Sequence, residues 1–336
     1  MQDKLLFVIG SPRSGSTMLQ RMIGSHSKIF THPEPHLMTP LAHLGYYDTV
    51  DKAPYDHINA AKAMREFVDE LPNGEQDYLD ACRAYTDTLY GRMLATREEK
   101  TLFLDKTPAY ALVTDFIQRV YPEARYVVLT RHPLAILSSY ANSFFAGDYD
   151  AAYRFNPILD RYVPAIARFL RDPDGPPRHH VRYEDVVADP DAALAGIFAF
   201  LGLEHEEEAV HYGKHDHIKK SFGDPNVDTH KRPTTRSVAK WASELAADAD
   251  KLSRAQGIVA GLTDADLETW GYPRDTFFEA LDEARSSGGA TPPKERINAY
   301  RVQRKILMRL RKNIHENQFG RVVKGVRYYC DVLLRD

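Results

Sequence analysis

The stretch GSPRSGST, residues 10–17, has the glycine spacing of a phosphate-binding loop but not its lysine. In nucleoside triphosphatases the pattern is G-x-x-x-x-G-K-[ST], where the lysine reaches the β- and γ-phosphates and the hydroxyl holds Mg²⁺. Here Ser16 stands at the lysine position, and Arg13 precedes it by three residues. Arginine is a permanently charged, planar donor that can bind an oxyanion through two hydrogen bonds. We therefore expect this loop to neutralise a terminal tetrahedral anion without a metal ion.

Two other segments carry groups suited to chemistry beside such an anion. In FTHPEPHLM, Pro33 and Pro35 exclude a regular helix, so we expect Glu34 in an extended turn that presents its carboxylate to a cleft. A carboxylate in that place could accept the proton of an attacking hydroxyl, and His36 is the alternative base. In FLDKTPAY, Lys106 follows a short apolar run and offers a second cation.

These segments resemble the sulfotransferases that use 3′-phosphoadenosine 5′-phosphosulfate (PAPS), and the resemblance spans Phe7 to about Trp241. The 5′-phosphosulfate loop of that family has the form P-R-S-G-[ST]-T, which SPRSGSTML matches. The resemblance implies that the 5′-phosphosulfate is held by Arg13, Ser14, Gly15, Ser16 and Thr17.

Three later segments extend the resemblance to the rest of the nucleotide. VVLTRHPLAILSSY looks like the family's 3′-phosphate motif, which implies that Arg131 and Ser139 bind this phosphate. VRYEDVVADP resembles the segment whose tyrosine lies beside the adenine, here Tyr183, with acids in the first turn of the following helix. KRPTTRSVAKW resembles the covering loop that adds a basic contact, for which Arg232 and Arg236 are the candidates, although the R-K-G triplet of the eukaryotic cytosolic enzymes is absent.

The resemblance also assigns the chemistry. Sugar-directed members carry E-x-H at the offset of Glu34 and His36, which implies Glu34 as general base with His36 as helper or rival. They also carry K-[ST]-P-x-Y, which implies that Lys106 and Arg13 stabilise charge at the sulfuryl group. The implied activity moves the sulfuryl group of PAPS to an acceptor hydroxyl and releases adenosine 3′,5′-bisphosphate. The acceptor stays open between a glycan or glycolipid, a lipid, a polyketide-like chain and a phenol.

Three other interpretations remain at this stage. In a P-loop kinase that uses Mg·ATP, Asp105 at the end of LFLD would hold the metal. In a non-catalytic nucleotide-binding scaffold, Glu34 and Lys106 would be dispensable. A metal site could use two sets of histidines, but neither set implies a full ligand shell, so we expect no metal. These sets are His32 with His36, and His211 with His215 and His217.

The elements that must position these residues alternate between strands and helices. Short apolar runs predict strands at Leu5–Ile9, Leu102–Leu104, Tyr126–Thr130 and His180–Tyr183. Helical periodicity predicts helices between them, at Ser14–Ser25, Ala109–Val120, Leu134–Phe145, Pro157–Leu170 and Ala192–Leu201. This alternation predicts an α/β fold with a mostly parallel central sheet, of the P-loop type. A strand that leads through a glycine loop into a helix directs backbone N–H groups and the helix dipole at one anion.

The chain divides into a sulfotransferase-like domain and a tail. We expect a domain over residues 1–285 with a helical insertion at about 40–100, from Ile58–Leu71 and Gln76–Thr96, whose tyrosines either pack as a cover or cap an acceptor pocket. Residues 213–237 are expected to form a mobile loop, and 286–293 a linker. Residues 294–336 contain twelve Lys or Arg against four Asp or Glu and predict a basic amphipathic helix. This helix could lie on a membrane surface, form an oligomer contact or pack back on the domain.

Composition sets limits on the class of protein. The chain has 336 residues, 43% hydrophobic content and a net charge of −3, which is enough for a large core and gives no argument for nucleic-acid binding. Only Cys82 and Cys330 are present, so no disulfide framework is indicated. No apolar run approaches the ~20 residues of a membrane span. We expect a cytoplasmic protein, with membrane association through the tail as an option.

The assignment of Glu34 as base gives a first prediction. Glu34→Gln removes the proton acceptor but keeps the size of the side chain. It should retain the affinity for adenosine 3′,5′-bisphosphate and lower turnover of PAPS by roughly 100-fold or more. Steady-state rates and calorimetric titration measure the two effects, and unchanged turnover would refute the assignment.

Overall fold

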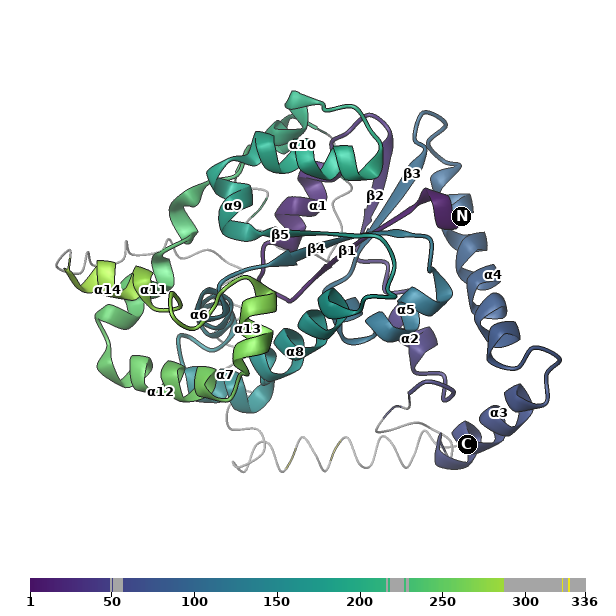
Figure 1. Cartoon of the computed structure of the whole chain (residues 1–336), viewed down its shortest axis with the longest axis horizontal. Coiled ribbons are helices and arrows are strands. Elements are labelled where there is room, and N and C mark those ends of the chain that lie inside the picture. Colours follow the sequence, from purple (N-terminus) through teal and green to yellow (C-terminus); the bar gives the residue numbers. More distant parts are fainter. Residues whose placement is uncertain are drawn as a thin grey trace.

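The computed structural model describes residues 1–48, 50, 57–215, 217, 227, 230–286, 322 and 326. Within these, a five-stranded parallel sheet has the strand order β2-β3-β1-β4-β5, with β1 at its centre (Figure 1). The strands are β1 (Leu5–Gly10), β2 (Ile29–Pro33), β3 (Leu102–Lys106), β4 (Arg125–Thr130) and β5 (Arg178–Arg182). The predicted α/β fold with a parallel sheet is therefore confirmed.

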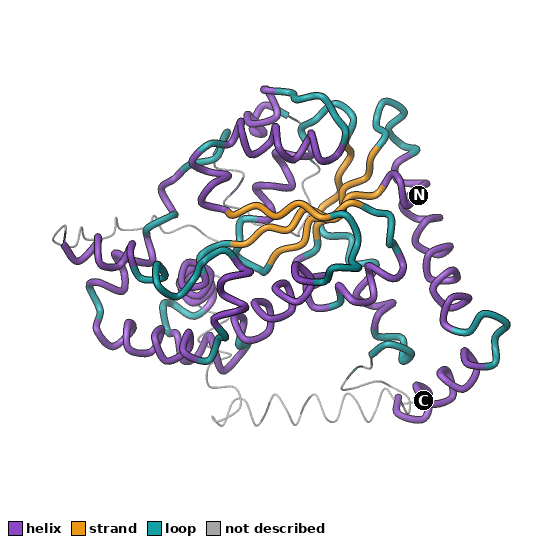
Figure 2. Tube along the Cα trace, in the orientation of Figure 1, coloured by secondary structure: helices purple, strands orange, loops and turns teal. Residues whose placement is uncertain are grey.

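Helices cover both faces of this sheet (Figures 1 and 2). One face is covered by α1 (Ser16–Gly24), α9 (Tyr183–Ala188), α10 (Pro190–Leu201) and the 3₁₀ segment η3 (Glu207–Lys214). The other face carries α2 (Met38–Ala42), α4 (Glu75–Leu94), η2 (Pro108–Leu112), α5 (Thr114–Val120), α6 (Pro133–Phe144), α7 (Tyr149–Phe155) and α8 (Ile158–Arg171).

Alternation along the strands decides which side chains reach which layer. Leu6 and Val8 of β1 pack with the α1 layer, whereas Phe7 and Ile9 pack on the opposite side. All six residues of β1 are buried. A strand covered on both faces is expected to be a continuous apolar run, as this one is. Burial of one such large side chain contributes about 1.5–3 kcal/mol, so the register of the central strand is strongly fixed.

The structure adds one strand to the predicted elements and corrects the bounds of three others. Residues 29–33 form β2, an edge strand that was not predicted and that pairs with β3 in register, Pro33 opposite Lys106. Tyr183 begins α9 and does not end β5. The single helix expected at 109–120 is divided, because η2 ends before Val113, which has a non-helical backbone, and α5 follows. The strand expected at 102–104 continues to Lys106.

The insertion after the first strand–helix unit is helical, as predicted. It contains α2, α3 (His57–Asp69) and α4, and α4 packs beside β3 and α5 while α3 projects from its far end (Figure 1). Tyr47 from this region packs with Phe116 of α5 and with Tyr78 of α4. The insertion therefore extends the core, which supports the interpretation that its tyrosines form a cover.

Four helices not predicted from the sequence follow the sheet. These are α11 (Lys240–Ala246), α12 (Ala249–Ala260), α13 (Asp264–Trp270) and α14 (Glu279–Ser286), preceded by the short η5 (Thr235–Ser237). α13 packs on α8, and α11 packs on α6. Ser286, the first residue of the predicted linker, is the last residue of α14. The rest of that linker, nearly all of the predicted tail and about half of the 213–237 loop lie outside the described residues.

Candidate active site

The predicted site residues gather along one edge of the sheet. All five strands are parallel, so the residues that follow their carboxyl ends lie along the same edge, where ligands of open α/β sheets bind. The residues at these ends are Arg13–Thr17 after β1, Glu34 and His36 after β2, Lys106 in β3, Arg131 after β4 and Tyr183 after β5.

The phosphate loop has a backbone that leaves the N-terminus of α1 open. Gly15 caps this helix with φ 93°, in the left-handed region, and no side chain bonds to the cap. A Cβ on Gly15 would lie 2.5 Å from the ring of Tyr183, so only glycine fits here. The first N–H groups of a helix have no partners within it, and they are therefore directed at the space beside the loop.

Arg13 and Arg131 are brought together from two different strands. The Nε of Arg13 donates to the Oγ of Ser139 at 3.1 Å, and its guanidinium lies 5.7 Å from the ring of Phe144. Arg131 donates from Nη1 to the carbonyl of Arg13 at 3.0 Å. The loop, the end of β4 and α6 therefore form one connected unit, in which Ser139 bonds to Arg13.

Arg131 is held from the C-terminal side of the chain as well. Its Nη2 donates to the carbonyl of Ser237 at 3.0 Å. The backbone carbonyl of Arg131 accepts a hydrogen bond from the indole Nε1 of Trp270 at 2.8 Å. The Arg131 guanidinium lies 4.3 Å from the ring centre of Tyr183, whose hydroxyl bonds to Ser237 Oγ at 2.7 Å. Burial lowers the pKa of Arg131 from its ordinary value.

Two buried polar atoms in this region lack partners among the described residues. They are the Oγ of Ser14 and the Nε of Arg131, in side chains that are 0% and 7% exposed. An unsatisfied buried donor costs free energy, so a native structure normally supplies a partner. An anionic ligand beside the loop is a suitable partner for both atoms, and the residues present therefore fit a phosphorylated nucleotide.

Lys106 joins the phosphate loop to Glu34. Its Nζ donates to Thr17 Oγ1 at 3.2 Å and to Glu34 Oε1 at 2.5 Å. The Lys106 side chain is 0% exposed and that of Glu34 is 13% exposed. His36 Nε2 lies 3.8 Å from the other Glu34 oxygen and is the most open of the three, at 41%. A buried ammonium needs such partners, because burial of an isolated charge is very costly.

The turn that carries Glu34 differs from the extended turn expected from its prolines. Glu34 and His36 have φ of 35° and 55°, and Arg13 in the phosphate loop has φ 68°. Left-handed backbone at residues other than glycine costs of order 1–3 kcal/mol and is found where the surroundings enforce it, often at functional sites. Three of the four such residues in the described chain, Ala146 being the other, belong to the candidate site.

Asp105 points away from the phosphate loop. It precedes Lys106 on β3, so the two side chains lie on opposite faces of the sheet. Its carboxylate is fully buried and accepts hydrogen bonds from Tyr90 (2.6 Å), Tyr110 (3.0 Å) and Thr107 (3.1 Å). Burial raises the pKa of Asp105 to about 6, against the effect of these donors. A carboxylate enclosed in this way is not placed to hold Mg²⁺ at the loop, which removes the main support for the kinase interpretation.

Two of the predicted ligands, Arg232 and Arg236, come from the covering loop. Arg236 lies in η5 and Arg232 just before it, and both are exposed. The carbonyl of Arg232 accepts a 3.4 Å hydrogen bond from Tyr212. Within the described residues, neither guanidinium forms a hydrogen bond to the phosphate loop, so their roles stay predictions. Glu184 lies in the first turn of α9 as expected and accepts hydrogen bonds from the N–H of His132 and the hydroxyl of Tyr272.

The histidine sets considered for a metal differ in surroundings. His32 bonds to the Pro33 carbonyl through Nδ1, whereas His215 and His217 bond to backbone carbonyls near η3. In the part of the chain that the structure describes, no group of three or more His, Cys, Asp or Glu residues could hold a metal ion.

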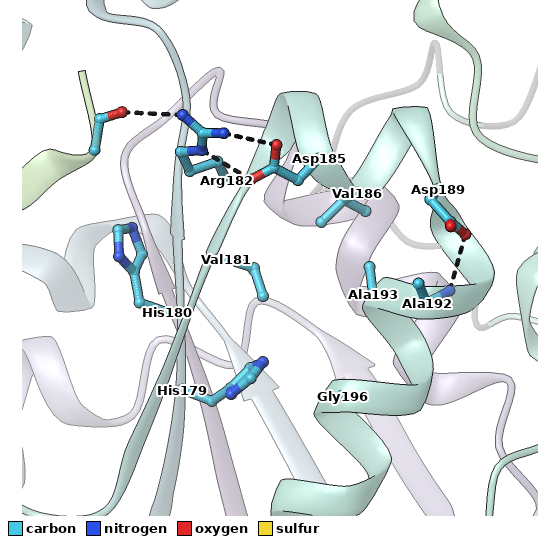
Figure 3. A pocket seen from close by; sticks show the side chains of 11 residues that line it. His179, His180, Val181, Arg182, Asp185, Val186, Asp189, Ala192, Ala193 and Gly196 are labelled. Atoms are coloured by element: carbon cyan, nitrogen blue, oxygen red, sulfur yellow. Dashed lines mark hydrogen bonds and ion pairs between the residues drawn. The ribbon is translucent and has the colours of Figure 1, made fainter.

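A cavity of about 640 Å³ lies beside the edge strand β5 (Figure 3). It is lined by the outer part of β5, by α9 and α10 and by Gly271, and Arg182 spans it from Asp185 to the Gly271 carbonyl. None of the predicted site residues lines it. We therefore assign the candidate site to the strand ends and not to this cavity.

Three residues that support the site were missed from the sequence. Ser237 and Trp270 hold Arg131, and Tyr110 bonds to Asp105. Tyr110 is the tyrosine of the K-T-P-x-Y segment, so its spacing from Lys106 was a usable signal. Ser237 and Trp270 lie more than a hundred residues from Arg131, and no local pattern identifies them.

Comparison with known proteins identifies the family of the chain. Residues 6–207 match the sequence profile described as "Sulfotransferase family", and the chain belongs to this family. "Nodulation protein NoeE" of Sinorhizobium fredii is 31% identical over 265 residues, which cover 72% of this chain and 60% of NoeE. The chain thus spans less than two-thirds of the length of that relative.

Solved sulfotransferase structures show a weaker likeness. The "Sulfotransferase Domain from the Synechococcus PCC 7002 Olefin Synthase" is 24% identical, with a TM-score of 0.48, over 77% of this chain and 95% of that domain. The "Sulfotransferase Domain from the Curacin Biosynthetic Pathway" is 22% identical, with a TM-score of 0.46, over 70% of this chain and 89% of that domain. Of the described helices, none is long and apolar enough to span a membrane.

The position of Arg131 gives a second prediction. Arg131→Ala should weaken adenosine 3′,5′-bisphosphate binding by about 10- to 100-fold, because it removes a charge-assisted donor from the expected 3′-phosphate site. Adenosine 5′-phosphosulfate lacks the 3′-phosphate, so its affinity should change far less. Calorimetry with both nucleotides measures the difference. Equal weakening would mean that Arg131 supports the loop without binding the 3′-phosphate.

The buried Asp105 gives a third prediction, on stability. Its pKa is about 6 in the fold and near 3.8 in the unfolded chain, so the folded state binds the extra proton between these values. Its contribution to the free energy of unfolding should fall by about 3 kcal/mol as the pH rises from about 4 to about 6. Asp105→Asn cannot titrate and should lack this decrease. Urea unfolding of both proteins between pH 4 and pH 7 measures the difference, and parallel curves would refute it.

Proposed function

We propose that this protein is a sulfotransferase that moves the sulfuryl group of PAPS to an acceptor hydroxyl by in-line transfer. The observation that carries the proposal is the position of Lys106, a buried cation between Thr17 of the phosphate loop and Glu34. The group to be transferred is bound on one side of this cation, and the base that prepares the acceptor lies on the other. PAPS supplies the activated sulfuryl group, and adenosine 3′,5′-bisphosphate is the product.

The donor would be held along the ends of β1, β4 and β5. Arg13, Ser14 and the N–H groups at the start of α1 would bind the 5′-phosphosulfate, where the helix dipole favours an anion. Arg131 and Ser139 would bind the 3′-phosphate, and Tyr183 would lie beside the adenine. The unpartnered Ser14 Oγ and Arg131 Nε support this assignment.

Glu34 would accept the proton of the acceptor hydroxyl. Its Oε1 accepts a hydrogen bond from Lys106 Nζ, and 13% of its side chain is exposed. Lys106 and Arg13 would stabilise the charge that develops on the sulfuryl and bridging oxygens. His36 is placed to orient the acceptor or to share the proton, since it lies 3.8 Å from Glu34.

The acceptor class is proposed from the E-x-H segment. We favour a glycan or glycolipid hydroxyl, because Glu34-Pro35-His36 has the form found in sugar-directed sulfotransferases. A cytoplasmic location is proposed with it, because the described residues include no membrane-spanning helix and the chain carries only two cysteines. A lipid, polyketide-like or phenolic acceptor would be the alternatives.

Calorimetric titration tests the donor and gives a fourth prediction. In buffer with EDTA, adenosine 3′,5′-bisphosphate should bind with a Kd in the micromolar range or below, which corresponds to about −8 kcal/mol. ATP with excess Mg²⁺, titrated in a matched buffer without EDTA, should bind at least 10-fold more weakly. Glu34→Gln is the control, because it removes the base and should bind the bisphosphate as the unsubstituted protein does. A preference for Mg·ATP would overturn the proposed function in favour of a kinase.

A further inference from the structure

A closed hydrogen-bond network lies behind the strand that carries Lys106. The carboxylate of Asp105 accepts from Tyr90 and Tyr110 at the same oxygen, Oδ2, and from Thr107 at the other. Burial raises the pKa of both tyrosines well above the usual value, so the phenols keep the hydrogens that they donate. The site chemistry described above uses none of these four residues.

Tyr110 differs from Tyr90 in a bond to the backbone at the start of α2. The backbone N–H of Met38 donates a hydrogen bond to the Tyr110 hydroxyl at 3.1 Å, and this hydroxyl donates its own hydrogen bond to Asp105. Met38 is the first residue of α2, and its side chain is fully buried. Tyr110 therefore ties the start of α2 to β3 through a single side chain.

The segment between these anchors is the turn that contains Glu34 and His36. On one side it leaves β2 at Pro33, which is in register with Lys106. On the other side it enters α2 at Met38. Glu34 and His36 have left-handed backbone, which the sequence alone does not favour, so the two ends must hold the turn in place.

We propose that Tyr110, oriented by Asp105, is a positioning residue that fixes the turn carrying Glu34 against Lys106. The inference rests on the proposed role of Glu34 as base. The hydroxyl of Tyr110 sets where α2 begins, and the register of β2 sets where the turn begins. Between these two points the turn holds the Glu34 carboxylate within hydrogen-bond distance of Lys106. Loss of the hydroxyl should therefore act on the chemical step and leave donor binding unchanged.

Two phenylalanine substitutions separate positioning from general support of the core. Tyr110→Phe removes the bond to Met38 and one bond to Asp105, and Tyr90→Phe removes one bond to the same oxygen of Asp105 without touching the turn. Both rings are nearly fully buried, Tyr110 against Phe7 and Tyr90 against Phe103, so each substitution keeps the packing. Thermal unfolding of both variants shows whether their losses of stability match.

Turnover of PAPS, measured as bisphosphate release with chitotetraose as the acceptor probe, gives the fifth prediction. Tyr110→Phe should lower kcat by about 10- to 100-fold, because small misplacement of a reacting group has effects of this size. The KM for PAPS and the Kd of the bisphosphate should stay within about twofold. Tyr90→Phe should keep kcat within about twofold. Equal values of kcat in the two variants would overturn the proposal.

Hydrogen exchange provides a readout that does not depend on turnover. Peptides that contain Met38 should exchange faster in Tyr110→Phe than in Tyr90→Phe, because only the first loses the acceptor of the Met38 N–H. Identical exchange at Met38 would overturn the anchoring role. If the unsubstituted protein binds the bisphosphate but transfers no sulfuryl group, the proposed function fails, and exchange at Met38 still decides whether Tyr110 anchors the turn. If Tyr110→Phe does not fold, Asp105→Asn takes its place and should lower kcat in the same direction.

Discussion

The site depends on one buried ion pair, between Lys106 and Glu34. An ammonium group without solvent exposure is stable only beside an opposite charge and further acceptors, and here Glu34 and Thr17 provide them. This requirement constrains the whole sheet. A shift of β3 by one residue would turn Lys106 into the apolar layer and Asp105 toward the phosphate loop. Phe103 and Leu104 precede Asp105 and Lys106 on β3 and pack into opposite core layers. Their packing therefore helps to fix the register of the strand.

The sequence identified those parts of the fold whose signals are local. The buried strand at Leu5–Gly10 and the loop after it could be predicted because an apolar run and glycine spacing coincide. β2 was missed because three of its five residues, IFTHP, are polar or proline and give no apolar run. Such a composition is tolerated because the strand lies at the edge of the sheet. The left-handed backbone of Glu34 could not be predicted either. The contacts of this turn, from Met38 to Tyr110 and from Glu34 to Lys106, involve residues about seventy positions away, so no local pattern specifies them.

The C-terminal helices hold Arg131 and His132 in place although they lie beyond the family match at 6–207. His132, next to Arg131, stacks on Trp241 with ring centres 4.2 Å apart and bonds to the Phe277 carbonyl at 2.9 Å. Burial lowers the pKa of His132 to about 4, so the ring is neutral and accepts from the Leu134 N–H as the cap of α6. The position of Arg131 is thus set by packing across the whole domain, which a motif of fourteen residues cannot specify.

The strand order β2-β3-β1-β4-β5 places the two halves of the site on opposite sides of the central strand. Arg131 and Tyr183 belong to the β4–β5 side, whereas Glu34, His36 and Lys106 belong to the β2–β3 side. The phosphate loop lies between them and contacts both halves, through Arg13 and Thr17. Under the proposed function, evolution could therefore change the acceptor by altering β2, α2 and the helical insertion while the nucleotide half stayed intact. A fold divided in this way allows one donor chemistry to serve many acceptors.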